Sequence, residues 1–203
     1  MHPDHTEPPV TNPDLIHAVT PGAKIIIIMR DPIKRMQSAF QFFCARGVYK
    51  CDRPLNGDKF HTLVTAAVSV MQQCLLEHSV RSCVYNTTNH QLATHLYASM
   101  YSVYIKDWLR VFPREQLYIT RFEDHIVDQF SSVKSMFRFL DVPPPEKDWS
   151  EWIDKRGVAT YFSRDKITML PQTEELLRGF FRPHNTELAH ILGDKKYTWD
   201  YDM

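Results

Sequence analysis

Arg30 and Ser38 are the two residues of this chain whose types and spacing are best suited to binding chemistry. An arginine can bind a phosphate monoester through two parallel, charge-assisted hydrogen bonds, and a serine hydroxyl can donate one more. The surrounding motif reads Arg-Asp-Pro-x-x-Arg-x-x-Ser-x-Phe and ends at Phe40. The spacing also allows an ordinary interpretation, in which the arginine pairs with an acidic neighbour and the serine lies on a solvated helix face.

A buried strand, a sharp turn and a helix are expected to position this motif. Lys24–Met29 is a short apolar run of mostly β-branched residues, which indicates a strand buried on both faces, as in a parallel sheet. Pro32 fixes a helical φ at the first turn of the helix that follows, and Asp31 is the candidate N-cap. Arg30 therefore lies at the carboxyl end of a strand, where open α/β sheets bind their ligands.

The motif resembles the 3′-phosphate-binding motif of the sulfotransferases that use 3′-phosphoadenosine 5′-phosphosulfate, above all their Golgi carbohydrate branch. The matching residues are Arg30, Asp31, Pro32, Arg35, Ser38 and Phe40. The segment Leu176–Gly193 resembles the terminal helix pair of heparan and chondroitin sulfotransferases through Phe180, Phe181, Pro183, Asn185, Leu188 and Gly193, followed by Trp199. The resemblance runs from about Asp14 to Trp199. It is strongest toward the chondroitin branch that adds a 6-O-sulfate to 4-sulfated N-acetylgalactosamine.

This resemblance implies an α/β fold of the P-loop-NTPase-like type, with three layers and a central parallel sheet. It implies transfer of a sulfuryl group to a hydroxyl of a chondroitin- or dermatan-type sugar, with the 6-hydroxyl of N-acetylgalactosamine 4-sulfate as the expected acceptor. Arg30 and Ser38 would bind the 3′-phosphate of the donor. Arg164 lies in a basic, glycine-containing loop that could close over a nucleotide phosphate or be an ordinary solvated loop. Arg35 is the weaker candidate, because it could pack against an acidic partner instead.

One part of the family pattern has no counterpart in this sequence. Family members begin with a strand and a Pro-Lys-x-Gly-Thr loop that holds the 5′-phosphosulfate with backbone amides at a helix N-terminus. The segment 21–24, Pro-Gly-Ala-Lys, precedes the strand without an intervening helix, so it cannot take this role. The N-terminal strand, the catalytic lysine and the general base are expected outside this chain, which resembles the C-terminal part of a sulfotransferase. We expect a disordered lead-in over residues 1–13 and the sulfotransferase domain over 14–203.

A second strand is predicted at Gln116–Phe122, followed by the acidic pair Glu123 and Asp124. In the family a second parallel strand ends in such a pair. The pair could supply a catalytic carboxylate, or it could cap the next helix and bind an arginine. Lys24–Met29 and Leu117–Thr120 are therefore predicted in one sheet. The expected helices are 13–19, 33–46 with Gly47 as its stop, 60–80, 92–111 ending before Pro113, 127–140, and 172–181 with a break at Pro183 and a continuation over 185–192.

The four cysteines form two close pairs, Cys44 with Cys51 and Cys74 with Cys83. This spacing suggests disulfides, but it leaves three connectivities and free buried thiols open. On one unbroken helix Cys74 and Cys83 would lie about 13 Å apart, whereas a disulfide needs Cα atoms closer than about 7 Å. A bond between them requires the helix to end near residues 78–81. Because the chain resembles luminal enzymes, we expect this Cys74–Cys83 disulfide.

Composition and short motifs limit which partners the chain could bind and indicate the compartment in which it works. The 24 basic residues balance 24 acidic ones, so no nucleic-acid partner is expected and a nucleotide or a sulfated glycosaminoglycan needs a local basic cluster. No segment approaches the roughly 20 apolar residues that cross a bilayer, so membrane attachment is expected only through an anchor outside this chain. Asn86 begins a glycosylation sequon. Sequon, paired cysteines and resemblance together indicate the Golgi lumen, as part of a type II membrane protein.

No metal is expected, because no Cys/His cluster has zinc-finger spacing. Two other interpretations stay open. One is an inactive, truncated protein of the sulfotransferase fold that only binds nucleotide or glycan. The other is a relative of P-loop kinases, against which count the absent Gly-x-x-x-x-Gly-Lys-Ser/Thr loop and the presence of Arg30 with Ser38.

Overall fold

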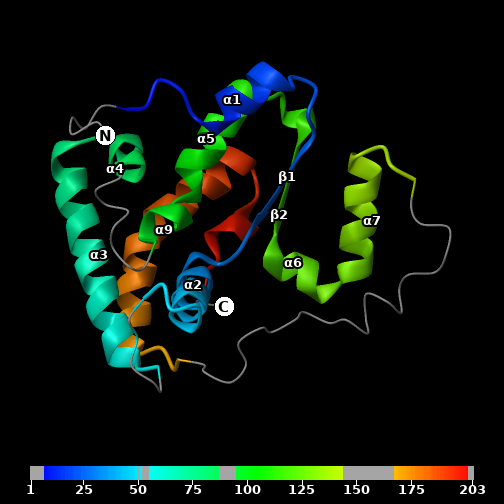
Figure 1. Cartoon of the computed structure of the whole chain (residues 1–203). Coiled ribbons are helices and arrows are strands. Elements are labelled where there is room, and N and C mark those ends of the chain that lie inside the picture. The colour runs from blue at the N-terminus through cyan, green and yellow to red at the C-terminus, as the bar shows by residue number, and fades with distance from the viewer. Residues whose placement is uncertain (1–6, 50, 52–54, 87–94, 144–166, 201–203) are drawn as a thin grey trace. The chain divides into compact units, whose positions relative to one another are not determined.

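The computed structural model describes residues 7–49, 51, 55–86, 95–143 and 167–200 (Figure 1). The chain divides into two compact units, a sheet unit and a helical unit. The sheet unit comprises residues 12–31 and 108–161, and the helical unit comprises residues 1–11, 32–107 and 162–203.

The sheet unit contains β1 (Ile25–Met29) and β2 (Leu117–Arg121), which lie side by side in Figure 1. The two strands are parallel, in a register that sets Ile25 opposite Leu117 and Met29 opposite Arg121. Both strands occur where the sequence predicts them and they share one sheet, so this prediction is confirmed. With helices following each strand, the α/β class is confirmed as well.

The prediction that β1 is buried on both faces is wrong for the described residues. Only Met29 is fully buried, and 46% of Ile28 is exposed. The physical reason is the size of the sheet, which has two strands within the described residues. An apolar strand is covered on both faces only where helices lie on both sides of a wider parallel sheet.

The described residues of the sheet unit also include α1 (Asn12–Val19), the 3₁₀ turn η3 (Arg114–Gln116), α6 (Phe122–Val127) and α7 (Gln129–Phe139). The helix expected over 127–140 corresponds to α7, while the short helix α6 before it was not expected. Asp128 separates the two helices with a φ of −143°, and its side chain accepts a hydrogen bond of 2.9 Å from the Ser131 amide. Aspartate is among the best N-cap residues, so it ends α6 and starts α7.

The helical unit is built from α2 (Pro32–Ala45), α3 (Gly57–Glu77), α4 (Val80–Tyr85), the 3₁₀ turn η2 (Leu96–Ser99), the first residues of α5 (Tyr101–Val111), α9 (Pro171–Leu192) and the 3₁₀ turn η4 (Lys195–Thr198). Its core gathers large side chains from α2, α3 and α9, including Met36, Phe40, Phe60, Val64, Leu177 and Phe181. The buried residues of α2 recur at intervals of three and four, which places them on one face of the helix.

Helix α2 ends as the sequence predicts, at Gly47. This glycine has a φ of +69°, in the left-handed region that favours residues without a Cβ. Its amide donates to the Cys44 carbonyl at 3.1 Å, and the Val48 amide donates to the Phe43 carbonyl at 2.9 Å. These two bonds form a Schellman motif, and the residues after it lead to Cys51, which is bonded to Cys44 with a Cα–Cα distance of 5.5 Å.

The disulfide between Cys74 and Cys83 is confirmed, with a Cα–Cα distance of 5.8 Å. The chain folds back at the expected place, because α3 ends at Glu77 and α4 begins at Val80. Ser79 caps the new helix, since its hydroxyl accepts a hydrogen bond of 3.1 Å from the Ser82 amide.

Replacing both Cys74 and Cys83 by alanine should lower the free energy of unfolding by about 2–3 kcal/mol, because the bond closes a loop of about ten residues in the unfolded chain. Urea unfolding under non-oxidising and oxidising conditions measures this loss. Mass spectrometry that finds both thiols free in the oxidised, secreted protein would contradict the assignment.

The helix expected over 92–111 is shorter than predicted: η2 ends at Ser99, Met100 leaves the helical region (φ −84°, ψ 64°), and α5 begins at Tyr101. Residues 92–94 lie outside the described residues. Tertiary hydrogen bonds explain the break, because the Arg35 side chain donates to the Ser99 hydroxyl at 2.5 Å and to the His95 carbonyl at 2.7 Å. The predicted end of this segment before Pro113 is confirmed.

The break expected at Pro183 does not occur, since α9 runs without interruption through this residue. Proline inside a helix removes one backbone hydrogen bond and typically costs about 3 kcal/mol. The helix buries side chains on both sides of the proline, among them Leu177 and Phe181 before it and Leu188 after it. This burial offsets the cost. Gly193, with a φ of +66°, ends the helix.

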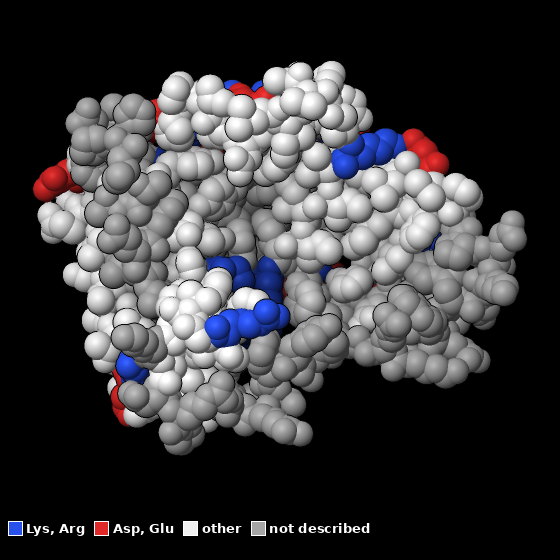
Figure 2. All heavy atoms as spheres, in the orientation of Figure 1, with Lys and Arg blue, Asp and Glu red and all other residues white. Residues whose placement is uncertain are grey.

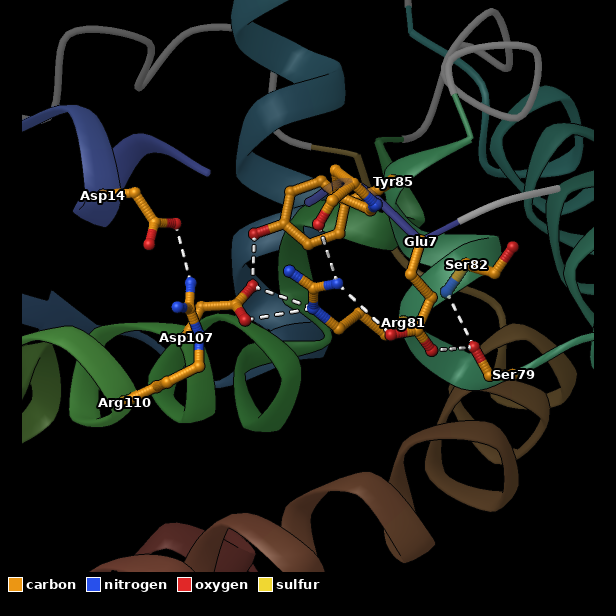
Figure 3. A network of polar contacts seen from close by, with 9 residues as sticks. Glu7, Asp14, Ser79, Arg81, Ser82, Tyr85, Asp107 and Arg110 are labelled. Carbon is orange, nitrogen blue, oxygen red and sulfur yellow. Dashed lines mark hydrogen bonds and ion pairs between the residues drawn. The ribbon is translucent and has the colours of Figure 1, made fainter. Parts of the chain in front are cut away.

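A buried carboxylate, Asp107, fixes the N-terminal segment to the helical unit (Figure 3). Asp107 is 4% exposed and accepts hydrogen bonds from Arg81 Nε at 3.0 Å and from the Tyr85 hydroxyl at 2.7 Å. Arg81 Nη1 also donates to Glu7 at 3.2 Å and to the Pro8 carbonyl at 3.0 Å. Glu7 and Pro8 therefore make specific contacts, although the sequence predicts disorder over residues 1–13. The helix α1 also begins before the end of that range, at Asn12.

On the face drawn in Figure 2, Lys and Arg atoms of the described residues appear in a few separate places, with residues of other kinds between them. Within the described residues, no helix combines the length and the apolarity that a membrane span requires.

Candidate functional site

The carboxyl ends of β1 and β2 bring four residues of the sheet unit together. Because Met29 pairs with Arg121, the residues that follow them leave the sheet at the same edge. The Arg30 guanidinium lies 5.1 Å from the centre of the Phe122 ring, a cation–π contact. The buried Asp31 amide donates a hydrogen bond of 2.9 Å to Glu123 Oε1. Arg30 is therefore held against an aromatic ring at the sheet edge where ligands of α/β proteins bind.

The acidic pair after β2 takes the structural role that the sequence left open. Glu123 accepts from the Asp31 amide, which joins the end of β1 to the start of α6. Asp124 binds the Arg121 guanidinium with two hydrogen bonds, of 2.5 Å and 3.2 Å. These contacts give both carboxylates a structural role.

The other predicted site residues lie in different parts of the chain. Ser38 is a half-buried residue of α2. Since Arg30 belongs to the sheet unit and Ser38 to the helical unit, the 3′-phosphate clamp stays a prediction. Arg164 lies outside the described residues. Asn86 is the half-buried residue that ends α4, and the other two residues of its sequon lie outside the described residues.

Arg35 has partners that the sequence did not predict. The expected acidic partner is not among its contacts, which are the hydroxyl of Ser99 and the carbonyl of His95. Burial lowers the pKa of the Arg35 guanidinium, although four tyrosines around it act in the other direction. Burial raises the pKa of one of them, Tyr49, to about 12. The sequence carries no signal for this cluster, because its members come from three separate segments.

Within the described part of the chain, no group of three or more His, Cys, Asp or Glu side chains is arranged to hold a metal ion.

Comparison with known proteins identifies close relatives. A family model described as "Sulfotransferase domain" matches residues 11–177. Human carbohydrate sulfotransferase 15 is 34% identical over 197 residues, which cover 95% of this chain and 34% of that protein. The mouse protein of the same name is 36% identical over the same shares. The chain thus spans about a third of the length of these curated relatives.

More distant matches include one sequence relative and one solved structure. The bifunctional heparan sulfate N-deacetylase/N-sulfotransferase of Drosophila melanogaster is 26% identical over 89% of this chain and 17% of that protein. The crystal structure of a sulfotransferase from Alicyclobacillus acidocaldarius superimposes with a TM-score of 0.58 at 20% identity, over 90% of this chain and 59% of that one. At this identity the structural likeness shows the fold alone.

Proposed function

Because this chain belongs to the sulfotransferase family, we propose that it takes part in sulfuryl transfer to a carbohydrate and binds the donor 3′-phosphoadenosine 5′-phosphosulfate. The observation that carries the proposal is the position of Arg30, which follows a parallel strand directly and is held against Phe122. A guanidinium fixed in this way loses little conformational freedom when it binds a phosphate with both arms.

Arg30 and Ser38 have the role of positioning the donor. The arginine would hold two oxygens of the 3′-phosphate, and the serine hydroxyl would donate to the third. This arrangement selects a nucleotide that carries a 3′-phosphate, and it orients the sulfuryl group for in-line attack by the acceptor hydroxyl. No residue of this chain is assigned to the proton transfer or to stabilising the leaving group.

The acceptor that we propose is the 6-hydroxyl of N-acetylgalactosamine 4-sulfate in a chondroitin- or dermatan-type glycosaminoglycan, on the basis of the sequence resemblance described above. The Golgi lumen is the proposed compartment. Two disulfides and the Asn86 sequon support it, because disulfides persist in oxidising compartments and sequons are glycosylated only there.

Replacing Ser38 by alanine tests this function. The wild-type chain should bind adenosine 3′,5′-bisphosphate more tightly than adenosine 5′-phosphate, from which it differs only by the 3′-phosphate. Because a hydroxyl supplies one hydrogen bond, Ser38→Ala should weaken bisphosphate binding by about 2- to 12-fold and leave binding of the monophosphate unchanged. Isothermal titration calorimetry measures both affinities.

The matched control is Ser135→Ala, which removes a serine hydroxyl from α7 whose described bond is to the Ser131 carbonyl. It should leave both affinities unchanged. A wild-type chain without preference for the bisphosphate, or equal weakening of both ligands by Ser38→Ala, would contradict the proposed function.

A further inference from the structure

Arg35 places a positive charge inside the helical unit without a carboxylate to balance it. Its Nε donates to the Ser99 hydroxyl and its Nη2 to the His95 carbonyl, and both acceptors are neutral. No carboxylate among the described residues forms an ion pair with it. Arg35 is half-buried, and charges removed from water are usually paired with an opposite charge. An anionic ligand would therefore balance a charge that no described carboxylate pairs with.

Tyr49 adds a second group that lacks a partner. Its hydroxyl oxygen is buried and makes no hydrogen bond. Its ring is held by neighbouring rings, with centroid distances of 5.3 Å to Phe43 and 6.2 Å to His95. A buried hydroxyl without a partner is rare in folded proteins and requires an explanation, such as a bound ion or water.

The two groups lie in one cluster. The Arg35 charge acts on the phenols of both Tyr49 and Tyr97 and stabilises their ionised forms. His95 connects these residues. Its ring Nδ1 lies 3.1 Å from the Tyr97 hydroxyl, and its backbone carbonyl accepts a hydrogen bond from Arg35. His95 has a φ of +47°, in the sparsely populated left-handed region, and its neighbours hold it there. An unbalanced guanidinium and hydroxyl donors in one place favour an anion.

We propose that Arg35, Tyr49 and Tyr97 form a subsite for a tetrahedral oxyanion, carried by a ligand as a sulfate or phosphate monoester. Arg35 Nη1 makes no hydrogen bond to a described residue and can donate to the oxyanion, as can the Tyr49 hydroxyl. The subsite is inferred from these groups. The identity of its ligand rests on the proposed function, which offers two sources: the sulfate ester of a glycan acceptor and a phosphate of the nucleotide.

Tyr49→Phe is the decisive variant, because it removes a hydroxyl that binds nothing in the protein. We expect its melting temperature to stay the same or rise. We expect its affinity for the oxyanion to fall about tenfold, the size of one hydrogen bond to a charged group. Arg35→Lys keeps the charge but loses the planar fork, so it should also weaken binding.

The matched control is Tyr85→Phe, which removes a hydroxyl that donates to Asp107 at 2.7 Å. This control should lower the melting temperature and leave oxyanion affinity unchanged. A structural role for the Tyr49 hydroxyl would instead lower the melting temperature of Tyr49→Phe as well.

The experiment is calorimetry on the full chain with three probes, each with its reference. The probes are inorganic sulfate, N-acetylgalactosamine 4-sulfate against N-acetylgalactosamine, and adenosine 3′,5′-bisphosphate against adenosine 5′-phosphate. If Tyr49→Phe binds the sulfated sugar more weakly than the wild-type chain does, the ligand of the subsite is a glycan sulfate. If it binds the bisphosphate more weakly, the ligand is a nucleotide phosphate. Either result supports the subsite.

The proposal would be overturned if Tyr49→Phe left the affinities for all probes unchanged. It would also be overturned if the wild-type chain bound none of the probes. Either result would mean that the cluster holds water only. Ser38→Ala separates this outcome from a failure of the proposed function. If the subsite is absent but the donor site is real, Ser38→Ala still weakens the bisphosphate selectively while Tyr49→Phe does not.

Discussion

Replacing Asp107 by alanine should lower the free energy of unfolding by about 3 kcal/mol, the largest loss expected from a single polar residue in this chain. The Asp107 carboxylate is almost fully buried and accepts from both Arg81 and Tyr85. Its removal leaves the Tyr85 hydroxyl and part of the Arg81 guanidinium without an acceptor in the protein interior. Urea unfolding monitored by circular dichroism measures the loss.

The matched control is the aspartate–arginine pair of Asp14 and Arg110, which is also drawn in Figure 3. Its oxygen and nitrogen lie 2.7 Å apart, but 48% of the arginine side chain is exposed. Ion pairs exposed to water contribute little, so Asp14→Ala should cost at most about 1 kcal/mol. Equal losses in the two variants would contradict the assignment of Asp107 as the buried anchor of the N-terminal segment.

The sheet and the ends of its strands could be predicted from the sequence. A β-branched run followed by Arg-Asp-Pro indicates a strand that ends at a helix start, and β1 follows this pattern. β2 also ends directly at the start of a helix, α6. The reversal between Cys74 and Cys83 was also predictable, because the distance that a disulfide permits excludes an unbroken helix. In both cases a local geometric rule determines the result.

The helix break at Met100 and the uninterrupted helix at Pro183 could not be predicted in the same way. Their outcome depends on tertiary contacts: Arg35 binds the turn before α5, and the buried faces of α9 offset the cost of its proline. Periodicity describes one helix at a time and does not include such contacts.

The candidate site was predictable only in part. The motif shows that Arg30 ends a strand, but the ring of Phe122, which holds the guanidinium, comes from a segment about ninety residues later. The absence of an acidic partner for Arg35 depends likewise on three segments that the sequence does not place together.

Arg30→Ala should weaken the binding of adenosine 3′,5′-bisphosphate by about 10- to 150-fold, because a hydrogen bond to a charged group contributes about 1.5–3 kcal/mol. The effect should exceed that of Ser38→Ala, since a guanidinium donates two such bonds and a hydroxyl one. Lys34→Ala is the control for general electrostatics, because it removes one positive charge from the exposed face of α2. This control should change the affinity less than about twofold.

The central claim is that Arg30 recognises the 3′-phosphate of the sulfuryl donor. The most direct test is calorimetry of the wild-type chain and Arg30→Ala, each titrated with adenosine 3′,5′-bisphosphate and with adenosine 5′-phosphate. We expect Arg30→Ala to lose the preference for the bisphosphate while its affinity for the monophosphate and its melting temperature stay close to those of the wild type. Equal weakening of both nucleotides would show that Arg30 supports the fold or the 5′ end of the nucleotide, and the account would be wrong.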